Sequence, residues 1–493
     1  MEKLVLPFFV LFIFSKRFLS YLIIINFLVF FINTPLSVSA GEDNQNRGLS
    51  DINALDELVP NLAGKGSPYG DEATRFHAAG GHKHKYFEQE HLSDFILERQ
   101  RSTLEEHGIS LEALYIQDFI SNHGGGMKRA GADIDGIMES MSHIDLTIEI
   151  DTEAAGLWKN GSLFSYIFYH DGANPTTDFI GDLQVAENYM ADDGLKVYEL
   201  WYEHTFDLFG TDLSLLAGLH DLNGEFSVTD YGLLFVQSSF GFNNEISNNI
   251  AVANYPVAAL GFRLKWDITD NFFYRGEISD GDPGRDNCGL RHINLSNKDG
   301  FVTFHEMVYH FGDMEDSKSM PGTYKLGWWY HSDEFDDVRD TDADGNAIVH
   351  DGNYGIYFIA DQMLLPGEGD TGLGVFFQIG GVPDDRNQVD FYVGGGFHYK
   401  GIIPQREDDI FGLAIAHARI GDDQRDADDL AEDDPTLSFH STDTHETVIE
   451  LTYKAQVLPW LAVQPGVQRI FNPGAVADYD DAFVSIFRFQ IDL

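Results

Sequence analysis

Residues 196–206 read Lys-Val-Tyr-Glu-Leu-Trp-Tyr-Glu-His-Thr-Phe, and side chains of different character alternate along them. A period of two is typical of a β-strand. One face carries Tyr198, Leu200, Tyr202 and His204, and the other carries Val197, Glu199, Trp201, Glu203 and Thr205. The first face is suited to lipid. The second suits a wet channel, because a buried unpaired carboxylate is costly. The alternative is the exposed face of an ordinary sheet.

Short alternating segments of this kind continue to the C-terminus. The clearest is 144–151, where Ile144, Leu146, Ile148 and Ile150 share one face. The segments number sixteen: 111–119, 144–151, 162–170, 196–206, 212–220, 260–267, 271–279, 301–310, 323–331, 353–363, 371–380, 388–400, 409–420, 446–456, 460–470 and 482–492. No run of 18 apolar residues follows the N-terminal region, so a β-barrel is the remaining way for the rest of the chain to cross a membrane.

The connections between these segments alternate in length, as they do in outer-membrane barrels. The long ones are 120–143, 171–195, 221–259, 280–300, 332–352 and 421–445, with shorter ones at 381–387 and 471–481. The tight ones include 268–270, 366–370 and 458–459. We therefore predict an all-β fold, a sixteen-stranded antiparallel transmembrane barrel over 109–493, with the long connections outside the cell. The 221–259 connection either folds into the lumen or covers the mouth.

The N-terminus has the pattern of a secretory signal. Lys16 and Arg17 precede an uncharged, largely apolar run to Ala40, which ends in Val-Ser-Ala. This order predicts a signal peptide over 1–40, and an N-terminal membrane anchor is the alternative. Residues 41–88 are polar and predict a mobile arm. Residues 89–108 have near-helical apolar spacing and predict a short amphipathic helix before the barrel.

The charge balance excludes one large class of partners. Removing the leader takes away three basic residues and one acidic residue, which leaves 28 basic and 79 acidic residues and a formal charge of −51. Phosphate-backbone binding requires clustered Lys and Arg, so we expect no nucleic-acid partner. Cys288 is the single cysteine, so no intrachain disulfide is available.

Several short motifs, in this order and at this spacing, resemble those of the OprB-type carbohydrate-selective porins of bacterial outer membranes. The resemblance covers about residues 104–493. Its motifs are Tyr198-Glu-Leu-Trp-Tyr-Glu203, Ser238-Ser-Phe-Gly241, Tyr255-Pro256, Gly261-Phe-Arg-Leu-Lys265, Asp280-Gly-Asp-Pro-Gly284, Gly352-Asn-Tyr-Gly355 and Ala360-Asp-Gln362. The resemblance implies a barrel in the outer membrane that passes small sugars down their gradient.

The predicted polar faces contain groups suited to sugars, which are neutral polyols with apolar ring faces. Such ligands need hydrogen-bonding groups of both kinds and aromatic surfaces. The candidate pore-lining residues are Glu199, Trp201, Glu203, Arg263, Lys265, Arg275 and Glu277. Three basic residues on neighbouring strands suggest acid and base rows that face each other across a constriction. The alternative is that these charges only pair with one another and solvate the wall.

An acidic stretch in the 332–352 connection has the spacing of a calcium loop. Asp340, Asp342, Asp344 and Asp351 occupy positions 1, 3, 5 and 12 of a twelve-residue segment with Gly345 at position 6. This is the ligand spacing of an EF-hand loop, although position 12 is Asp in place of Glu and no flanking helices are expected. We predict a calcium site here, and the alternative is a solvated acidic loop. We expect no required cofactor.

The C-terminal segment completes the list of expected partners. One face at the very end of the chain carries Phe487, Phe489, Ile491 and Leu493. An outward aromatic and apolar row on the last strand is typical of the assembly signal of outer-membrane barrels. We therefore expect contact with membrane lipid and with the barrel assembly machinery. The sequence leaves the oligomeric state open.

Two other functions compete with a sugar channel. The first is a secreted enzyme acting on polysaccharide, with Glu199 and Glu203 as acid and base. Four residues along a strand separate them by about 13 Å, beyond either glycosidase geometry, so we expect no enzyme. The second is a surface barrel that acts as an adhesin or polysaccharide-binding protein, and sixteen strands favour an open channel over this reading.

Overall fold

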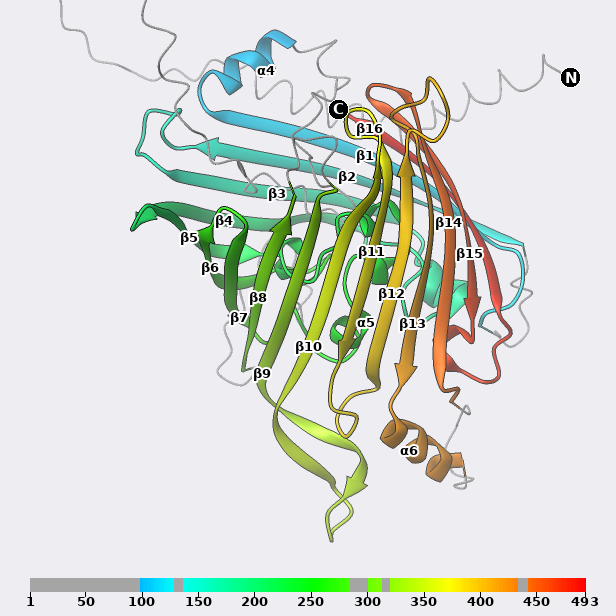
Figure 1. Cartoon of the computed structure of the whole chain (residues 1–493). Helices are drawn as coiled ribbons and strands as arrows, with labels where there is room; N and C mark the ends of the chain where they lie inside the picture. Colours follow the sequence, from blue (N-terminus) through cyan, green and yellow to red (C-terminus); the bar gives the residue numbers. More distant parts are fainter. Residues whose placement is uncertain (1–97, 128–135, 284–299, 313–319, 433–441) are drawn as a thin grey trace, which may run out of the picture. The chain divides into compact units, whose positions relative to one another are not determined.

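Sixteen antiparallel β-strands form a closed barrel in the part of the chain that the computed structural model describes, residues 98–127, 136–283, 300–312, 320–432 and 442–493 (Figure 1). The strands are β1 (Ile109–Asn122), β2 (Ile137–Asp151), β3 (Gly161–Gly172), β4 (Gly194–Leu208), β5 (Thr211–His220), β6 (Ala259–Thr269), β7 (Phe272–Asp280), β8 (Phe301–Phe311), β9 (Gly322–Thr341), β10 (Ala347–Pro366), β11 (Gly372–Gly381), β12 (Val389–Lys400), β13 (Ile410–Ile420), β14 (His445–Leu458), β15 (Leu461–Phe471) and β16 (Ala482–Asp492). Each of the sixteen predicted segments falls on one strand.

Few helices accompany the barrel. The α-helices of the described residues are α4 (Glu98–Glu105), α5 (Asn244–Ser247) and α6 (Asp422–Glu432). Single helical turns are η1 (Thr176–Ile180), η2 (Leu222–Gly224), η3 (Gly232–Leu234), η4 (Ser238–Phe240) and η5 (Pro473–Ala475). None of these helices is long and apolar enough to cross a membrane.

The predicted N-terminal features lie mostly outside the described residues. The signal peptide over 1–40 and the arm over 41–88 fall there entirely, as does the first part of the helix expected over 89–108. The described part of that helix is α4, which ends at Glu105. The turn that follows contains Gly108, whose φ of 72° lies in the left-handed region that favours glycine.

The alternation of side chains sorts the strand residues into an inner and an outer face, as predicted. On β4, Glu199 is buried inside while Leu200 is 57% exposed on the outside. The apolar outer face continues around the barrel, for example at Phe262 and Phe377. Such a face is suited to lipid.

One side chain of the opening stretch departs from this alternation. The alternation predicts Tyr198 on the outer face, but it is buried, with 2% exposed. The register between β3 and β4 shifts at Tyr166 and Ile167, whose partners are Glu199 and Val197. A β-bulge at Tyr198 therefore turns two successive side chains inward, which a strict period of two cannot anticipate.

The first and last strands close the barrel. β1 pairs with β16 from Leu114 and Asp492 to Asn122 and Val484. The predicted outward row of β16 is confirmed at Phe487, which is 38% exposed.

β9 and β10 extend further than the sequence predicts. Their ladder continues to Thr341 and Ala347, so most of the expected 332–352 loop is a two-stranded hairpin that projects beyond the neighbouring strands (Figure 1). The acidic 421–445 connection, predicted only as a long connection, begins with helix α6. Arg339 on the hairpin binds Asp423 and Asp426 on this helix, so ion pairs join the two elements.

Two of the long connections lie inside the barrel. The 173–193 loop joins β3 to β4, and the 221–258 loop joins β5 to β6. Most residues of the 221–258 loop are buried, as are Phe179, Ile180 and Glu187 of the 173–193 loop, and Figure 1 shows the second loop with α5 within the ring of strands. The structure thus decides the question that the sequence left open, because the 221–258 loop enters the lumen.

Candidate functional site in the barrel lumen

Buried carboxylates of the barrel wall hold the 221–258 loop by its backbone. Asp361 on β10 accepts from the amides of Asp230 and Tyr231, both at 3.0 Å through Oδ1. Glu450 on β14 accepts from the amides of Val236 and Gln237, each at 2.9 Å. A carboxylate that binds backbone N–H groups makes charge-assisted bonds and satisfies donors that burial would otherwise leave unpaired.

A third carboxylate ties the start of this loop to several strands. Glu306 on β8 accepts from the amide of Ser227 at 2.9 Å and from the hydroxyl of Tyr357 at 2.8 Å. Arg275 on β7 contacts the other oxygen of Glu306 at 2.5 Å. From β9, Lys325 donates to the carbonyl of Val228 at 2.7 Å. The loop is therefore fixed to the wall from several directions.

The 173–193 loop is also held by its backbone, from the neighbouring strands β14 and β15. Glu446 on β14 accepts from the amides of Leu183 at 2.7 Å and Gln184 at 2.9 Å. From β15, Gln468 donates to the carbonyl of Ala186 at 2.9 Å.

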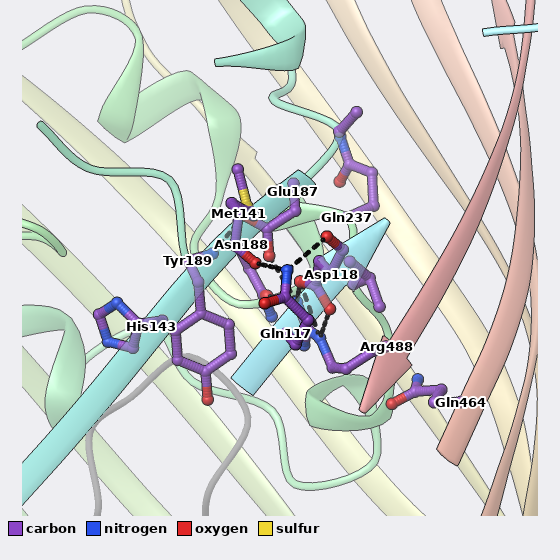
Figure 2. A network of polar contacts seen from close by, with 12 residues as sticks. Gln117, Asp118, Met141, His143, Glu187, Asn188, Tyr189, Gln237, Gln464 and Arg488 are labelled. Atoms are coloured by element: carbon purple, nitrogen blue, oxygen red, sulfur yellow. Dashed lines mark hydrogen bonds and ion pairs between the residues drawn. The ribbon is translucent and has the colours of Figure 1, made fainter. Parts of the chain in front are cut away.

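Arg488 on β16 is the centre of the network around the next residues of this loop (Figure 2). It binds Asp118 on β1 at 2.8 Å, so it spans the seam at which the barrel closes. The same nitrogen contacts Glu187 at 2.5 Å and the side-chain oxygen of Asn188 at 2.9 Å. The guanidinium also lies over the ring of Tyr189, 4.8 Å from its centroid. One cation thus joins two strands to the loop.

The two loops contact each other as well as the wall. The amide of Ser238 donates to the carbonyl of Val185 at 2.9 Å, and the side chain of Gln237 donates to the carbonyl of Gln184 at 2.7 Å. We call this region, where the 173–193 and 221–258 loops meet inside the barrel, the constriction. It narrows the lumen with ordered, hydrogen-bonded backbone.

Four of the seven predicted pore-lining residues belong to ion pairs near this constriction. Arg263 binds Glu203 at 3.0 Å and the loop residue Glu225 at 2.8 Å, and it also donates to Ser214 at 2.7 Å. Arg275 binds Glu306, and Glu277 contacts His220 at 3.0 Å. Of these pairs, only Arg275 and Glu306 lie on neighbouring strands, β7 and β8, whereas Arg263 on β6 reaches past β5 to Glu203 on β4 and also binds the loop carboxylate of Glu225.

The other three predicted residues have different surroundings. Trp201 donates to Glu199 at 3.0 Å and stacks on Phe164 with 4.7 Å between ring centroids. Lys265 lies 4.9 Å from the ring centroid of Phe273 on β7. Of the seven, Lys265 is half-buried and the rest are buried. Direct contact with sugar therefore remains a prediction for each of them.

The sequence reasoning missed the residues that hold the loops. On the wall they include Glu306, Asp361, Glu446, Glu450, Gln468 and Arg488. A polar residue at an inward position of an otherwise apolar strand was the available indication, as at Glu306 between Phe304 and Val308. Their loop partners lie far away in the sequence, so spacing could not reveal them.

Acidic side chains of the inward loops have raised pKa values because burial disfavours the charged form. Burial raises the pKa of Asp182 to about 6 and that of Glu245 to about 8. Burial, reinforced by the charge of Asp118, holds the pKa of Glu187 well above its ordinary range. The constriction thus contains carboxyl groups that resist ionisation.

The predicted calcium ligands lie on the projecting hairpin. Asp342 accepts from the amides of Asp344 at 2.8 Å and Asn346 at 2.9 Å, while Asp340 binds Arg339 at 2.9 Å. Asp351 lies on β10 opposite Glu334. In the described residues no three His, Cys, Asp or Glu side chains are grouped so as to hold a metal ion. The calcium site stays a prediction.

A closed barrel of sixteen strands, apolar outside and narrowed inside by two anchored loops, defines a porin. A family model described as carbohydrate-selective porin, OprB family, matches residues 139–493. Porin B of Pseudomonas aeruginosa is 25% identical over 418 residues, which cover 79% of this chain and 89% of that protein. The putative porin QuiX of Acinetobacter baylyi is 21% identical over 418 residues, covering 80% and 91%.

The fold agrees with this assignment. The high pH structure of Pseudomonas putida OprB superposes with a TM-score of 0.71 at 23% identity, covering 81% of this chain and 97% of that one. The chain belongs to the OprB family of carbohydrate-selective porins. It is an outer-membrane channel for the passive diffusion of carbohydrates and not an enzyme.

Proposed function

We propose that the carbohydrates are small neutral sugars and that the constriction selects them by size. The single observation that carries this proposal is the pair of loops held inside the lumen by buried wall residues, including Glu446 and Glu450. Since selectivity follows the width and lining of the narrowest section, an ordered constriction favours small solutes over large ones.

The seven predicted residues support this function in two ways. Arg263 and Glu203, together with Glu225, hold the start of the 221–258 loop against the wall. Lys265, which is half-buried, is the best placed of the seven to meet solute. An adhesin would not need two loops anchored within its own lumen, so the channel accounts for more of the structure.

Liposome swelling tests the proposal. Vesicles containing the protein are diluted into isosmotic glucose, a disaccharide or a trisaccharide, and the initial swelling rates are compared with those of empty vesicles. We expect the rate to fall steeply from glucose to trisaccharide. Equal rates for all three sugars would contradict selection by size, and no swelling in glucose would contradict the transport of small sugars.

A further inference from the structure

A pair of wall residues lies where the two inward loops meet. Glu450 on β14 and Gln468 on β15 are direct partners in the strand register. Both side chains point inward and are at most 1% exposed. Gln468 Nε2 donates to Glu450 Oε2 at 3.1 Å, so the two side chains form one hydrogen-bonded unit.

Each member of this pair holds a different loop. Glu450 uses both oxygens to accept from the amides of Val236 and Gln237 in the 221–258 loop, at 2.9 Å each. Gln468 Nε2 also donates to the carbonyl of Ala186 in the 173–193 loop, at 2.9 Å. Close to these contacts the loops bond directly, Ser238 to Val185. A single cross-strand pair therefore connects both loops to the wall at the point where they join.

We propose that Glu450 and Gln468 are positioning residues that fix the two loops relative to each other and so set the aperture of the constriction. They act through the loops and not by contact with sugar, because both are covered by loop backbone. Because the site is buried, a loop amide that loses its acceptor is left without a hydrogen bond unless water enters or the loop moves. The proposal rests on the proposed function, because aperture matters only if solutes pass the constriction.

Two near-isosteric substitutions test the proposal. Glu450→Gln replaces one acceptor oxygen by an NH2 group that faces a backbone N–H. Gln468→Met keeps the length of the side chain and removes both donations. In each case we expect a folded barrel, shown by resistance to unfolding in detergent, with a single-channel conductance raised by about twofold and a lower ratio of glucose to disaccharide swelling rates, because a released loop widens the narrowest section.

The double variant and a matched control complete the experiment. Because the pair acts as a unit, Glu450→Gln with Gln468→Met should change the ratio little more than the stronger single variant does. Glu368→Gln is the control, since Glu368 is exposed in the tight turn at 366–370, and it should behave as wild type. If one single variant fails to fold, the other still tests the proposal.

The outcomes separate the two proposals. A selective wild-type channel whose folded variants keep the wild-type conductance and swelling ratio would overturn the positioning role and leave the proposed function intact. If the changes in the swelling ratio of the two single variants add in the double variant, the claim that Glu450 and Gln468 act as one unit would be overturned. A wild-type channel that does not discriminate between glucose and disaccharide would instead overturn the proposed function.

Discussion

Several carboxylates inside this barrel are bonded to loop backbone and not to a cation alone. Glu446, Glu450 and Asp361 each accept from two consecutive amides of an inward loop. A formal charge of −51 after removal of the leader favours a solvated acidic surface, and the acidic residues of the projecting hairpin and of α6 provide one. Composition cannot show that other acidic residues are buried and bind the loops, because a surface Asp or Glu and a buried one count alike.

At this scale the first prediction concerns Arg263. Arg263→Ala removes the cation between the buried carboxylates Glu203 and Glu225, and losing one partner of a buried ion pair costs about 3–5 kcal/mol. We expect the start of the 221–258 loop to loosen and the glucose swelling rate to change while the barrel stays folded. Arg425→Ala is the control, because its pair with Asp422 is exposed and worth about 0–1 kcal/mol. An unchanged rate in Arg263→Ala would refute this role.

The second prediction concerns pH and Glu245. The pKa of this buried carboxyl is about 8 in the docked loop, above its ordinary value of 4.5. A released loop ionises above about pH 4.5 whereas the docked one keeps its proton, so docking is favoured most below that pH, weakens as pH rises and loses this contribution above about pH 8. We expect proteolysis of the 221–258 loop to accelerate from pH 5 to pH 9.

Glu245→Gln provides the comparison for this prediction. The amide cannot ionise, so this variant should show a much flatter dependence of cleavage on pH. The exposed Glu368→Gln in a tight turn should follow wild type. Equal acceleration in wild type and in Glu245→Gln would exclude Glu245 as the source.

At the scale of elements, the sequence predicts every strand of the described barrel, because each carries a period-two pattern between polar connections. The errors arise where another interaction decides the structure. The β9–β10 ladder extends beyond the barrel into acidic residues whose sequence does not predict a strand. Helix α6 forms in a second acidic stretch, which Arg339 of the hairpin binds. The path of the 221–258 loop could not be predicted, since it depends on wall residues such as Glu450 that lie more than 200 positions away.

The third prediction concerns orientation. Alternation of long and short connections places 421–445 outside the cell and the tight turn at 366–370 in the periplasm. An epitope tag within 421–445 should bind antibody on intact cells. A tag at 366–370 should bind only after the outer membrane is permeabilised, and the reverse pattern would overturn the topology.

For the molecule as a whole, a channel with an internal constriction accounts for the apolar outer face, the closed strand ladder and the lumen narrowed by two loops. The ladder from β1 to β16 leaves no free sheet edge among the described strands, and Arg488 reinforces the closing seam from inside. The wall and the loops have different roles. The strands form a rigid tube, and the anchored loops narrow it. Function follows from this division, because a rigid, narrow and polar section can discriminate among neutral solutes.

Single-channel recording in planar lipid bilayers tests the central claim, that this chain is a sugar-conducting porin with a constriction inside its barrel. Ion current is measured while glucose is added to one side. We predict stable conducting steps whose current falls, saturably, as glucose occupies the constriction, with a smaller effect of a trisaccharide on the same channel. A barrel that inserts without conducting, or a current that no sugar changes beyond the effect of viscosity, would contradict the account.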